Sequence, residues 1–299
     1  MTLATDDFLD IDDATPAELD ALLDRAAAMK AGATDPRLSD AALGMIFEKP
    51  STRTRVSFET GMTRLGGHAM FLGPDDIQLG HGEPLRDTAR VLGRYVDGVM
   101  ARLFDHEDVE VLAEYADCPV INGLTDEAHP CQTLADLLTI REAVGEDATV
   151  AWVGDGNNVG QSFVVGAAMA GIDVRVATPA GYGMDPDVFD RARAFGADVT
   201  PTTDPESVVD DADVVYTDVW ISMGQEDVRD QKLAAFDGFQ LNADLLAGTG
   251  AKVMHCLPAH RGEEITDDVL ESDRALVWDQ AENRMHAQNA LLVELLGEA

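Results

Sequence analysis

Short apolar runs alternate with amphipathic stretches along most of this chain. The segment 16–30, PAELDALLDRAAAMK, opens on a proline and places leucines at helical spacing, so it predicts a helix. The apolar runs that follow are continuous rather than alternating. Continuous runs are typical of strands buried on both faces, as in parallel sheets covered by helices.

The runs and the stretches between them predict a repeated order of strand and helix. Expected strands are residues 42–47, 68–72, 97–103, 119–123, 149–154, 173–179, 197–200, 213–219 and 251–257. Expected helices after the first lie near residues 53–65, 85–95, 107–116, 132–144, 160–170, 186–195, 231–236, 266–271 and 282–297. Such alternation favours parallel sheets with helices on both faces.

The length of 299 residues fits two domains of about 150 residues each. The polar turn at Gly145–Asp147 predicts the boundary, with domains at 1–145 and 146–281. We expect the final helical segment, 282–299, to pack back on the first domain. The predicted fold class is α/β, with two doubly wound parallel-sheet α/β domains joined by interdomain helices.

Charge sets this chain apart from an ordinary globular sequence. Its formal net charge is −35 at pH 7, and its lysines are only Lys30, Lys49, Lys232 and Lys252. The apolar fraction of 45% argues against disorder. A folded, acidic, lysine-poor protein resembles those of salt-loving organisms, because at about 1 M salt the Debye length is only ~3 Å. The alternative is an ordinary acidic cytosolic protein. In either case nucleic acids and anionic membranes are poor partners.

Several features point to a cytoplasmic protein. No apolar stretch reaches the about 18 residues of a membrane span. The acidic start, MTLATDDFLDIDD, has neither a basic region nor an apolar core, so we expect no signal or transit peptide. Cys118, Cys131 and Cys256 are too few and too scattered for a disulfide framework or a zinc site.

The stretch FEKPSTRTRVSFE, residues 47–59, carries the first candidate chemistry. It follows a predicted strand and opens a predicted helix, whose first turn has free N–H groups. Ser51 and Thr52 add hydroxyl donors, and Arg53 and Arg55 add forked cationic donors suited to phosphate oxygens. The cluster predicts an anion site. The alternative is a capping serine followed by arginines that pair with surface carboxylates.

Other candidates lie at the ends of later strands. Arg102 ends DGVMAR, and His129 and Gln132 lie in EAHPCQ, after the strand PVING. A lone histidine in such a loop is more often structural, but this one belongs to the same predicted sheet as the arginines. The glycines of GDGNNVG are spaced one residue too far apart for the dinucleotide fingerprint, which disfavours a nicotinamide oxidoreductase.

These motifs together resemble the aspartate/ornithine transcarbamoylase family. STRTR, Arg102, the HPCQ segment and HCLP at 255–258 match it in order and spacing over nearly the whole chain. DVWISMG and GDGNN resemble the branch that uses ornithine. The resemblance implies transfer of a carbamoyl group from carbamoyl phosphate to the δ-amine of L-ornithine, giving L-citrulline and phosphate. It implies no cofactor, no metal and no covalent enzyme intermediate.

The resemblance also assigns residues to the carbamoyl phosphate site. They are Ser51, Thr52, Arg53, Thr54, Gln78, Arg102, His129, Gln132, Leu257 and Arg284. Arg102, His129 and Arg284 would act on the carbonyl oxygen as catalytic residues. Gln132 and the backbone carbonyl of Leu257 would accept hydrogen bonds from the carbamoyl NH₂ group.

A second set is assigned to ornithine. It comprises Asn158, Asp218, Ser222, Met223 and Cys256, of which Asp218 and Cys256 also count as catalytic. Asp218 would bind the α-amino group, and Cys256 would help orient the uncharged δ-amine. The alternative for Cys256 is a small buried hydrophobic residue.

Gln78 lies in a segment that resembles the family loop reaching into a neighbouring subunit. The resemblance therefore implies a homo-oligomer with shared active sites, a trimer or a multiple of trimers. The alternative is a surface loop with a helix cap. Two other functions stay open: a transcarbamoylase for another amine such as putrescine, and a non-catalytic regulatory homologue. The sequence also leaves open whether the reaction serves arginine synthesis or arginine breakdown.

Overall fold

A computed structural model describes residues 3–33, 38–74, 82–222, 224 and 226–297. The chain divides into two compact units, Met1–Leu138 with Glu282–Ala299, and Thr139–Ala281. The divisions fall inside two helices, α5 (Pro130–Ala143) and α11 (Val277–Leu296). Within the described residues, no helix is both long enough and apolar enough to cross a membrane.

The first unit is built on a four-stranded parallel sheet with the order β2-β1-β3-β4. The strands are β1 (Ala42–Phe47), β2 (His68–Leu72), β3 (Gly98–Arg102) and β4 (Val120–Leu124). Besides α5 and α11, its helical elements are η1 (Ile11–Asp13), α1 (Pro16–Lys30), α2 (Thr52–Arg64), α3 (Leu85–Leu92) and α4 (His106–Tyr115). Phe8 forms an isolated parallel bridge to Ile121 of β4.

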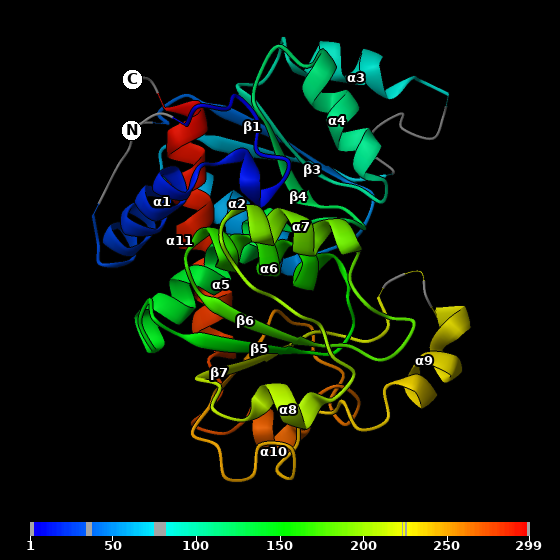
Figure 1. Ribbon diagram of the computed structural model, residues 1–299. Helices are drawn as coiled ribbons and strands as arrows, with labels where there is room; N and C mark the ends of the chain where they lie inside the picture. The colour runs from blue at the N-terminus through cyan, green and yellow to red at the C-terminus, as the bar shows by residue number, and fades with distance from the viewer. Residues whose placement is uncertain (1–2, 34–37, 75–81, 223, 225, 298–299) are drawn as a thin grey trace. The chain divides into compact units, whose positions relative to one another are not determined.

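Helices cover both faces of this sheet. Ala89 of α3 and Val109 of α4 share one apolar cluster with strand residues such as Val99. Figure 1 shows α3 and α4 on that face and α1, α2 and α11 on the opposite one. β1, β3 and β4 are therefore largely buried on both sides, which explains their continuous apolar runs, whereas the edge strand β2 is only partly buried.

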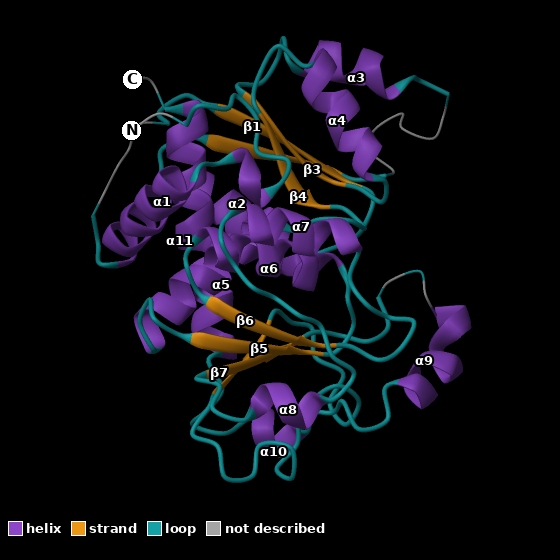
Figure 2. Ribbon diagram, viewed as in Figure 1, coloured by secondary structure: helices purple, strands orange, loops and turns teal. Residues whose placement is uncertain are grey.

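The second unit repeats the plan with the strand order β6-β5-β7-β8, again all parallel. The strands are β5 (Thr149–Val153), β6 (Asp173–Ala177), β7 (Val214–Thr217) and β8 (Lys252–His255). The helical elements are α6 (Asn158–Met169), α7 (Pro186–Ala194), α8 (Pro205–Val209), η2 (Glu226–Val228), α9 (Arg229–Ala235) and α10 (Asp267–Leu270). Figure 2 shows its strands in orange between purple helices.

Each face of the second sheet has its own core. On one face, Trp152 and Tyr216 lie 4.9 Å apart, centroid to centroid, and both pack on Phe163 of α6. The other face packs against α8 and α10 through residues such as Val209 and Leu270. The doubly wound α/β fold class expected from the alternating pattern is confirmed.

The strand order creates one switch point in each sheet. In the first unit, the chain leaves β1 toward β2 and then returns to β3 on the other side of β1. In the second unit, β5, β6 and β7 repeat this path. Ligands of such sheets bind beyond the carboxyl ends of the two strands where the order reverses. Ligand sites are therefore expected in the loops after β1 and β3, and after β5 and β7.

One expected strand is wrong. Residues 197–200 form no strand, and only Thr202 reaches the sheet, as an isolated bridge to Ala177. Thr202 N donates to Val176 O at 2.9 Å, but the preceding Pro201 has no N–H to extend a ladder.

Two helices also differ from the expected pattern. α8 was not expected, although Asp204 caps it and Pro205 opens it. α11 begins at Val277 rather than near residue 282. Its added first turns bury Gln280, whose Oε1 accepts from the backbone N–H of His255 at 3.0 Å.

Candidate active site

The loop after β1 places the Ser-Thr-Arg cluster at the start of α2. Ser51 is the N-cap residue, and its Oγ accepts from Thr54 N at 3.3 Å. Ser51 Oγ also donates to Thr54 Oγ1 at 3.1 Å, and Thr54 is buried. Arg53 is partly buried, and Thr52 is exposed at the first helical position. The first turn of α2 is therefore a rigid set of donors at the switch point.

A chain of buried polar side chains joins this turn to α5 and α11. Arg284 Nη2 donates to Thr54 Oγ1 at 3.3 Å, and Arg284 Nη1 donates to Gln132 Oε1 at 2.6 Å. Gln132 Nε2 in turn donates to Asp136 Oδ1 at 2.7 Å. All of these side chains are nearly inaccessible to solvent. Four residues proposed for the carbamoyl phosphate site, Ser51, Thr54, Gln132 and Arg284, are thus directly linked.

His129 is buried beside this network. Burial lowers the pKa of His129 well below its usual value, and the charges of Arg284, Arg102 and Arg53 lower it further. The imidazole is therefore neutral near pH 7. Arg102, the last residue of β3, is itself buried. Three arginines around one neutral histidine form a strongly positive spot in a chain of net charge −35.

Arg55 does not belong to this spot. Its Nε donates to Glu59 Oε1 at 3.0 Å, and its guanidinium lies 4.0 Å from the ring centroid of Phe71. The expectation that Arg55 adds a phosphate donor is therefore wrong. In the helix α2 it points toward solvent, one residue after the buried Thr54.

Lys49 is a residue that the sequence patterns did not single out. It is buried, forms an ion pair with Asp126 and lies with its Nζ 4.2 Å from the ring centroid of Phe104. These contacts tie the loop after β1 to the loops after β3 and β4. The scarcity of lysine was the one available signal, because a lysine kept in so acidic a chain has a specific contact.

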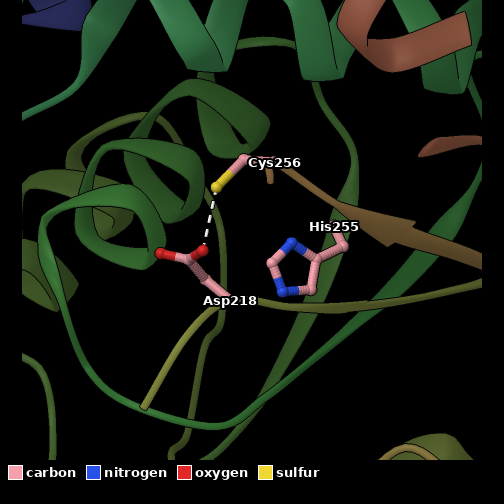
Figure 3. Close-up of side chains that lie close together, drawn as sticks. All are labelled: Asp218, His255 and Cys256. Carbon is pink, nitrogen blue, oxygen red and sulfur yellow. Dashed lines mark hydrogen bonds between the residues drawn. The ribbon is translucent and has the colours of Figure 1, made fainter. Parts of the chain in front are cut away.

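In the second unit, Asp218 follows β7 and is the centre of a hydrogen-bonded group (Figure 3). Its Oδ1 accepts from Cys256 Sγ at 2.9 Å, and its Oδ2 accepts from Asn157 Nδ2 at 2.8 Å. Asp218 and Cys256, both expected at the ornithine site, are therefore brought together.

His255 lies next to this pair, but its ring nitrogens are occupied. Leu257 N donates to its Nδ1 at 2.9 Å, so the ring proton is on Nε2, 3.0 Å from Glu264 Oε1. Figure 3 shows no hydrogen bond from His255 to Asp218 or Cys256. An imidazole, a carboxylate and a thiol lie within 4.8 Å here. Since both nitrogens of His255 are in use, its role is to hold the Cys256 loop.

A buried ion pair stands beside Asp218. Lys232 Nζ donates to Asp155 Oδ2 at 2.7 Å and to the backbone oxygen of Trp220 at 2.8 Å. Burial raises the pKa of Asp155, the Lys232 contact opposes that shift, and the charge of Asp218 adds to it. The pair links α9 to the GDGNN turn after β5. Its partners are far apart in sequence, so no local pattern indicates it.

The remaining expected residues are less directly connected. Asn158 is the first residue of α6, and its Oδ1 accepts from Val159 N at 3.0 Å; its neighbour Asn157 makes the contact to Asp218. Ser222 is partly exposed in the loop after β7, and Leu257 has a left-handed backbone with φ of 61°. Gln78 and Met223 lie outside the described residues.

Comparison with family models gives two matches that together cover most of the chain. Residues 6–142 match the carbamoyl-P binding domain of aspartate/ornithine carbamoyltransferase. Residues 146–295 match the Asp/Orn binding domain of the same family.

Individual proteins and structures are similar over the full length. An ornithine carbamoyltransferase of Haloquadratum walsbyi is 69% identical over 293 residues, covering 97% of this chain and 98% of that protein. One from Methanoculleus marisnigri is 53% identical, covering 97% and 96%. The solved structure of ornithine carbamoyltransferase from Pyrococcus furiosus is 50% identical, with a TM-score of 0.95 over 100% of this chain and 99% of that one.

Proposed function

This chain belongs to the aspartate/ornithine carbamoyltransferase family, and on that premise we propose that it carbamoylates L-ornithine. The carbamoyl group comes from carbamoyl phosphate and goes to the δ-amine, giving L-citrulline and phosphate. Relatives named ornithine carbamoyltransferase, up to 69% identical and matched over nearly their whole length, support this choice of substrate. No similar support exists for the alternatives, putrescine as acceptor or a non-catalytic regulatory role.

The observation that carries the proposal is the buried network of the first unit. Arg284 is fixed by Thr54 and Gln132, and its charge acts on His129 together with those of Arg53 and Arg102. Such fixed donors suit a phosphate and a developing negative charge on a neighbouring carbonyl oxygen. Because His129 is neutral, one ring nitrogen can donate to that oxygen without adding charge.

The chemistry then needs few protein groups. The amine nitrogen attacks the carbonyl carbon, a C–N bond forms, and the C–O bond to the departing phosphate breaks. The nitrogen releases one proton to the phosphate or to solvent. Ser51, Thr52, Arg53 and Thr54 hold the phosphate, while Arg102, His129 and Arg284 stabilise the charge on the carbonyl oxygen. Gln132 and the carbonyl of Leu257 accept from the carbamoyl NH₂.

The second unit supplies the acceptor site. Asp218 takes the α-amino group of ornithine, with Asn158, Ser222 and Met223 as further contacts. Cys256, whose thiol donates to Asp218, would help orient the δ-amine in its neutral form. A free amine of this kind has a pKa near ~10, so we expect activity to rise toward alkaline pH.

The first test offers three amines in parallel. Citrulline or other carbamoyl product is measured with ornithine, putrescine and aspartate in about 2–3 M KCl, where surface repulsion is screened. Ornithine alone should be a strong substrate. Equal use of putrescine would overturn the assignment of Asp218, Asn158 and Ser222 to the amino acid end of ornithine. Folded protein that is inactive with every amine would favour the regulatory alternative.

Matched variants test the carbamoyl phosphate site. Arg102→Gln removes one donor from the carbonyl oxygen and should lower kcat by roughly 100- to 1000-fold. Arg55→Gln is the control, because Arg55 is paired with Glu59 outside the site. An Arg102→Gln variant with normal kcat would contradict the role of Arg102.

We also propose a homo-trimer, or a multiple of trimers, in which Gln78 contributes to a neighbouring site. Gln78→Ala and Arg102→Gln chains, each inactive alone, should regain activity when mixed under conditions of subunit exchange. Restored sites would combine Gln78 of one chain with Arg102 of another. Mixed oligomers that stay inactive would overturn site sharing, and a monomer by light scattering would overturn the oligomer.

The compartment is a further proposal. Cys118, Cys131 and Cys256, all within the described residues, form no disulfide, which supports the expectation of a reducing cytoplasm.

A further inference from the structure

A compact group of metal-binding side chains lies in the turn that follows HCLP. His260, Glu263 and Glu264 belong to the segment HRGEE, and their three ligand atoms lie within 4.8 Å of one another. The three residues are close in sequence, and a sharp turn of the chain brings their side chains together. Glu263 N donates to His260 O at 2.9 Å, Gly262 N donates to Ile265 O at 2.8 Å, and Gly262 supplies the left-handed backbone with φ of 90°.

One polar atom of each residue in this group lacks a hydrogen-bond partner. These atoms are His260 Nδ1, Glu263 Oε2 and Glu264 Oε2, and each is inaccessible to solvent. Glu264 as a residue is 0% exposed. A buried carboxylate oxygen without a partner costs roughly 1–3 kcal/mol or more, so a ligand is expected at this place. His260 Nδ1 and Glu263 Oε2 are 3.9 Å apart, too far for a hydrogen bond between them.

The other carboxylate oxygens are already committed. Glu263 Oε1 pairs with Arg229, while Glu264 Oε1 accepts from His260 N at 2.6 Å and lies 3.0 Å from His255 Nε2. These contacts fix one oxygen of each carboxylate, while the second oxygens, Glu263 Oε2 and Glu264 Oε2, make no hydrogen bond. The arrangement is therefore fixed by the surrounding chain before any ligand arrives.

We propose that His260, Glu263 and Glu264 bind a divalent transition-metal ion of the zinc class. One imidazole with two carboxylates suits Zn²⁺ and its neighbours, while Ca²⁺ and Mg²⁺ prefer oxygen ligands alone. Three protein ligands leave a fourth position for water. This site is separate from Asp218 and Cys256, and it does not depend on the proposed activity.

For the pair His260 and Glu263, the geometry needs only a small adjustment. Zinc holds its nitrogen and oxygen ligands at about 2.0–2.2 Å, which places them roughly 3.4 Å apart in a tetrahedron. The 3.9 Å separation of His260 Nδ1 and Glu263 Oε2 would shorten by about 0.5 Å. The side chains of His260 and Glu263 are 39% and 22% exposed, so they can move and the ion can enter from solvent.

A bound ion would clip the turn after HCLP. It would join the two ends of HRGEE through side chains and act on Glu264, whose other oxygen holds His255. Metal binding to the folded state should therefore raise the melting temperature, and the rise should grow with the logarithm of free metal once the site is saturated.

The test uses metal-stripped protein in about 2 M KCl, which suppresses loose accumulation of cations on the acidic surface. Zn²⁺ binding is measured by calorimetry, and Co²⁺ binding by its visible spectrum. A Co²⁺ site made of nitrogen and oxygen lacks a thiolate charge-transfer band, whereas binding at Cys256 would show one. We expect one Co²⁺ per chain without that band, together with a rise in melting temperature.

Two variants remove single ligands, and a third is the matched control. His260→Gln and Glu263→Gln should weaken Zn²⁺ binding at least ~10-fold, since even the loss of an outer-shell partner costs about 10- to 100-fold. Asp267→Asn removes a nearby carboxylate that pairs with Arg261, as Glu263 pairs with Arg229, and should leave binding unchanged. Absence of Zn²⁺ binding, binding only with a thiolate band, or equal affinity in all three variants would overturn the proposal.

Discussion

The neutral state of His129 is the residue-scale feature with the clearest measurable consequence. Its folded pKa is lowered by burial and by three arginines, so below pH ~6.5 the unfolded chain binds a proton that the folded chain does not. Stability is therefore lost as pH falls below that value. One proton corresponds to a slope of about 1.4 kcal/mol per pH unit.

Replacing His129 should remove this part of the acid sensitivity. We expect His129→Asn to show a shallower loss of unfolding free energy than the unmodified chain between pH ~6.5 and ~5, measured by urea titration in molar KCl. His129→Gln should behave alike. Parallel curves for the variant and the unmodified chain would mean that His129 does not remain neutral in the folded state.

Residue roles were predictable where a local pattern fixes them. Ser51 caps α2 as the sequence indicates, because capping depends on the next three residues. Arg55 pairs with Glu59 in the same helix, as the alternative interpretation of the cluster expected, and only its contact with Phe71 of β2 was not predictable. The sequence likewise did not indicate that Asn157, rather than Asn158, contacts Asp218, because Asp218 comes close to them only in the folded unit.

At the scale of elements, the ion pair Lys232–Asp155 connects α9 to the turn after β5. We expect Lys232→Met to destabilise the chain by about 3–5 kcal/mol, because it leaves Asp155 buried without its cation. Lys252→Met is the control, since Lys252 Nζ makes only a 3.2 Å contact with Asp273 O at an exposed site. Urea unfolding in high salt measures both.

A double variant separates the charge effect from packing. Lys232→Met with Asp155→Leu removes both charges and should recover a large part of the loss. If the double variant is as unstable as the sum of the two single variants, the ion pair is not the cause.

The contact between α2 and α11 gives another prediction. A Cβ added at Gly61 would overlap Asn289 Oδ1, so Gly61→Ala should destabilise by about 1–3 kcal/mol. Alanine alone would favour the helix by up to ~1 kcal/mol, so the sign of the change is informative. Asn289→Ala in the same chain should restore most of the loss. A stabilised Gly61→Ala variant would contradict this packing.

Strands were predictable from short, continuous apolar runs, both in the buried β1 and in the partly buried edge strand β2. β1 and β2 coincide with their expected ranges, and most other strands are displaced only at their ends. The strand predicted at residues 197–200 does not form, because Pro201 lacks the N–H that would continue a ladder beside β6. A hydrophobic pattern does not reveal this. The sequence predicted that α11 begins near residue 282, but it begins at Val277. Its first turn is held by the contact of Gln280 with His255, which is distant in sequence and gives no local pattern.

For the whole molecule, the four lysines explain how so acidic a chain keeps its fold. Lys49 and Lys232 are buried in ion pairs, Lys30 donates to Asn283 Oδ1 at 2.8 Å, and Lys252 donates to Asp273 O. Each of the four lysines has a specific contact, while exposed cations such as Arg90 and Arg193 are arginines paired with surface carboxylates. The net charge of −35 then repels itself unless salt screens it.

Stability and substrate capture should therefore both rise with salt. Between about 0.1 M and 2 M KCl the Debye length falls from ~10 Å to below ~3 Å, so the melting temperature should increase. kcat/KM for carbamoyl phosphate, an anion, should increase over the same range. Maximal stability at low salt would contradict the prediction that this is a protein of halophilic type.

The course of the chain through its two units has an evolutionary consequence. Thr139–Ala281 is one uninterrupted segment, entered within α5 and left within α11, and its sheet has the same strand order as its host. An ancestral gene could have duplicated one scaffold and inserted the copy into the original. Selection could then remodel the inserted copy for a new acceptor molecule while the host kept its donor chemistry. A chimera that exchanges only this segment with a relative of different acceptor preference would recreate that history in one step.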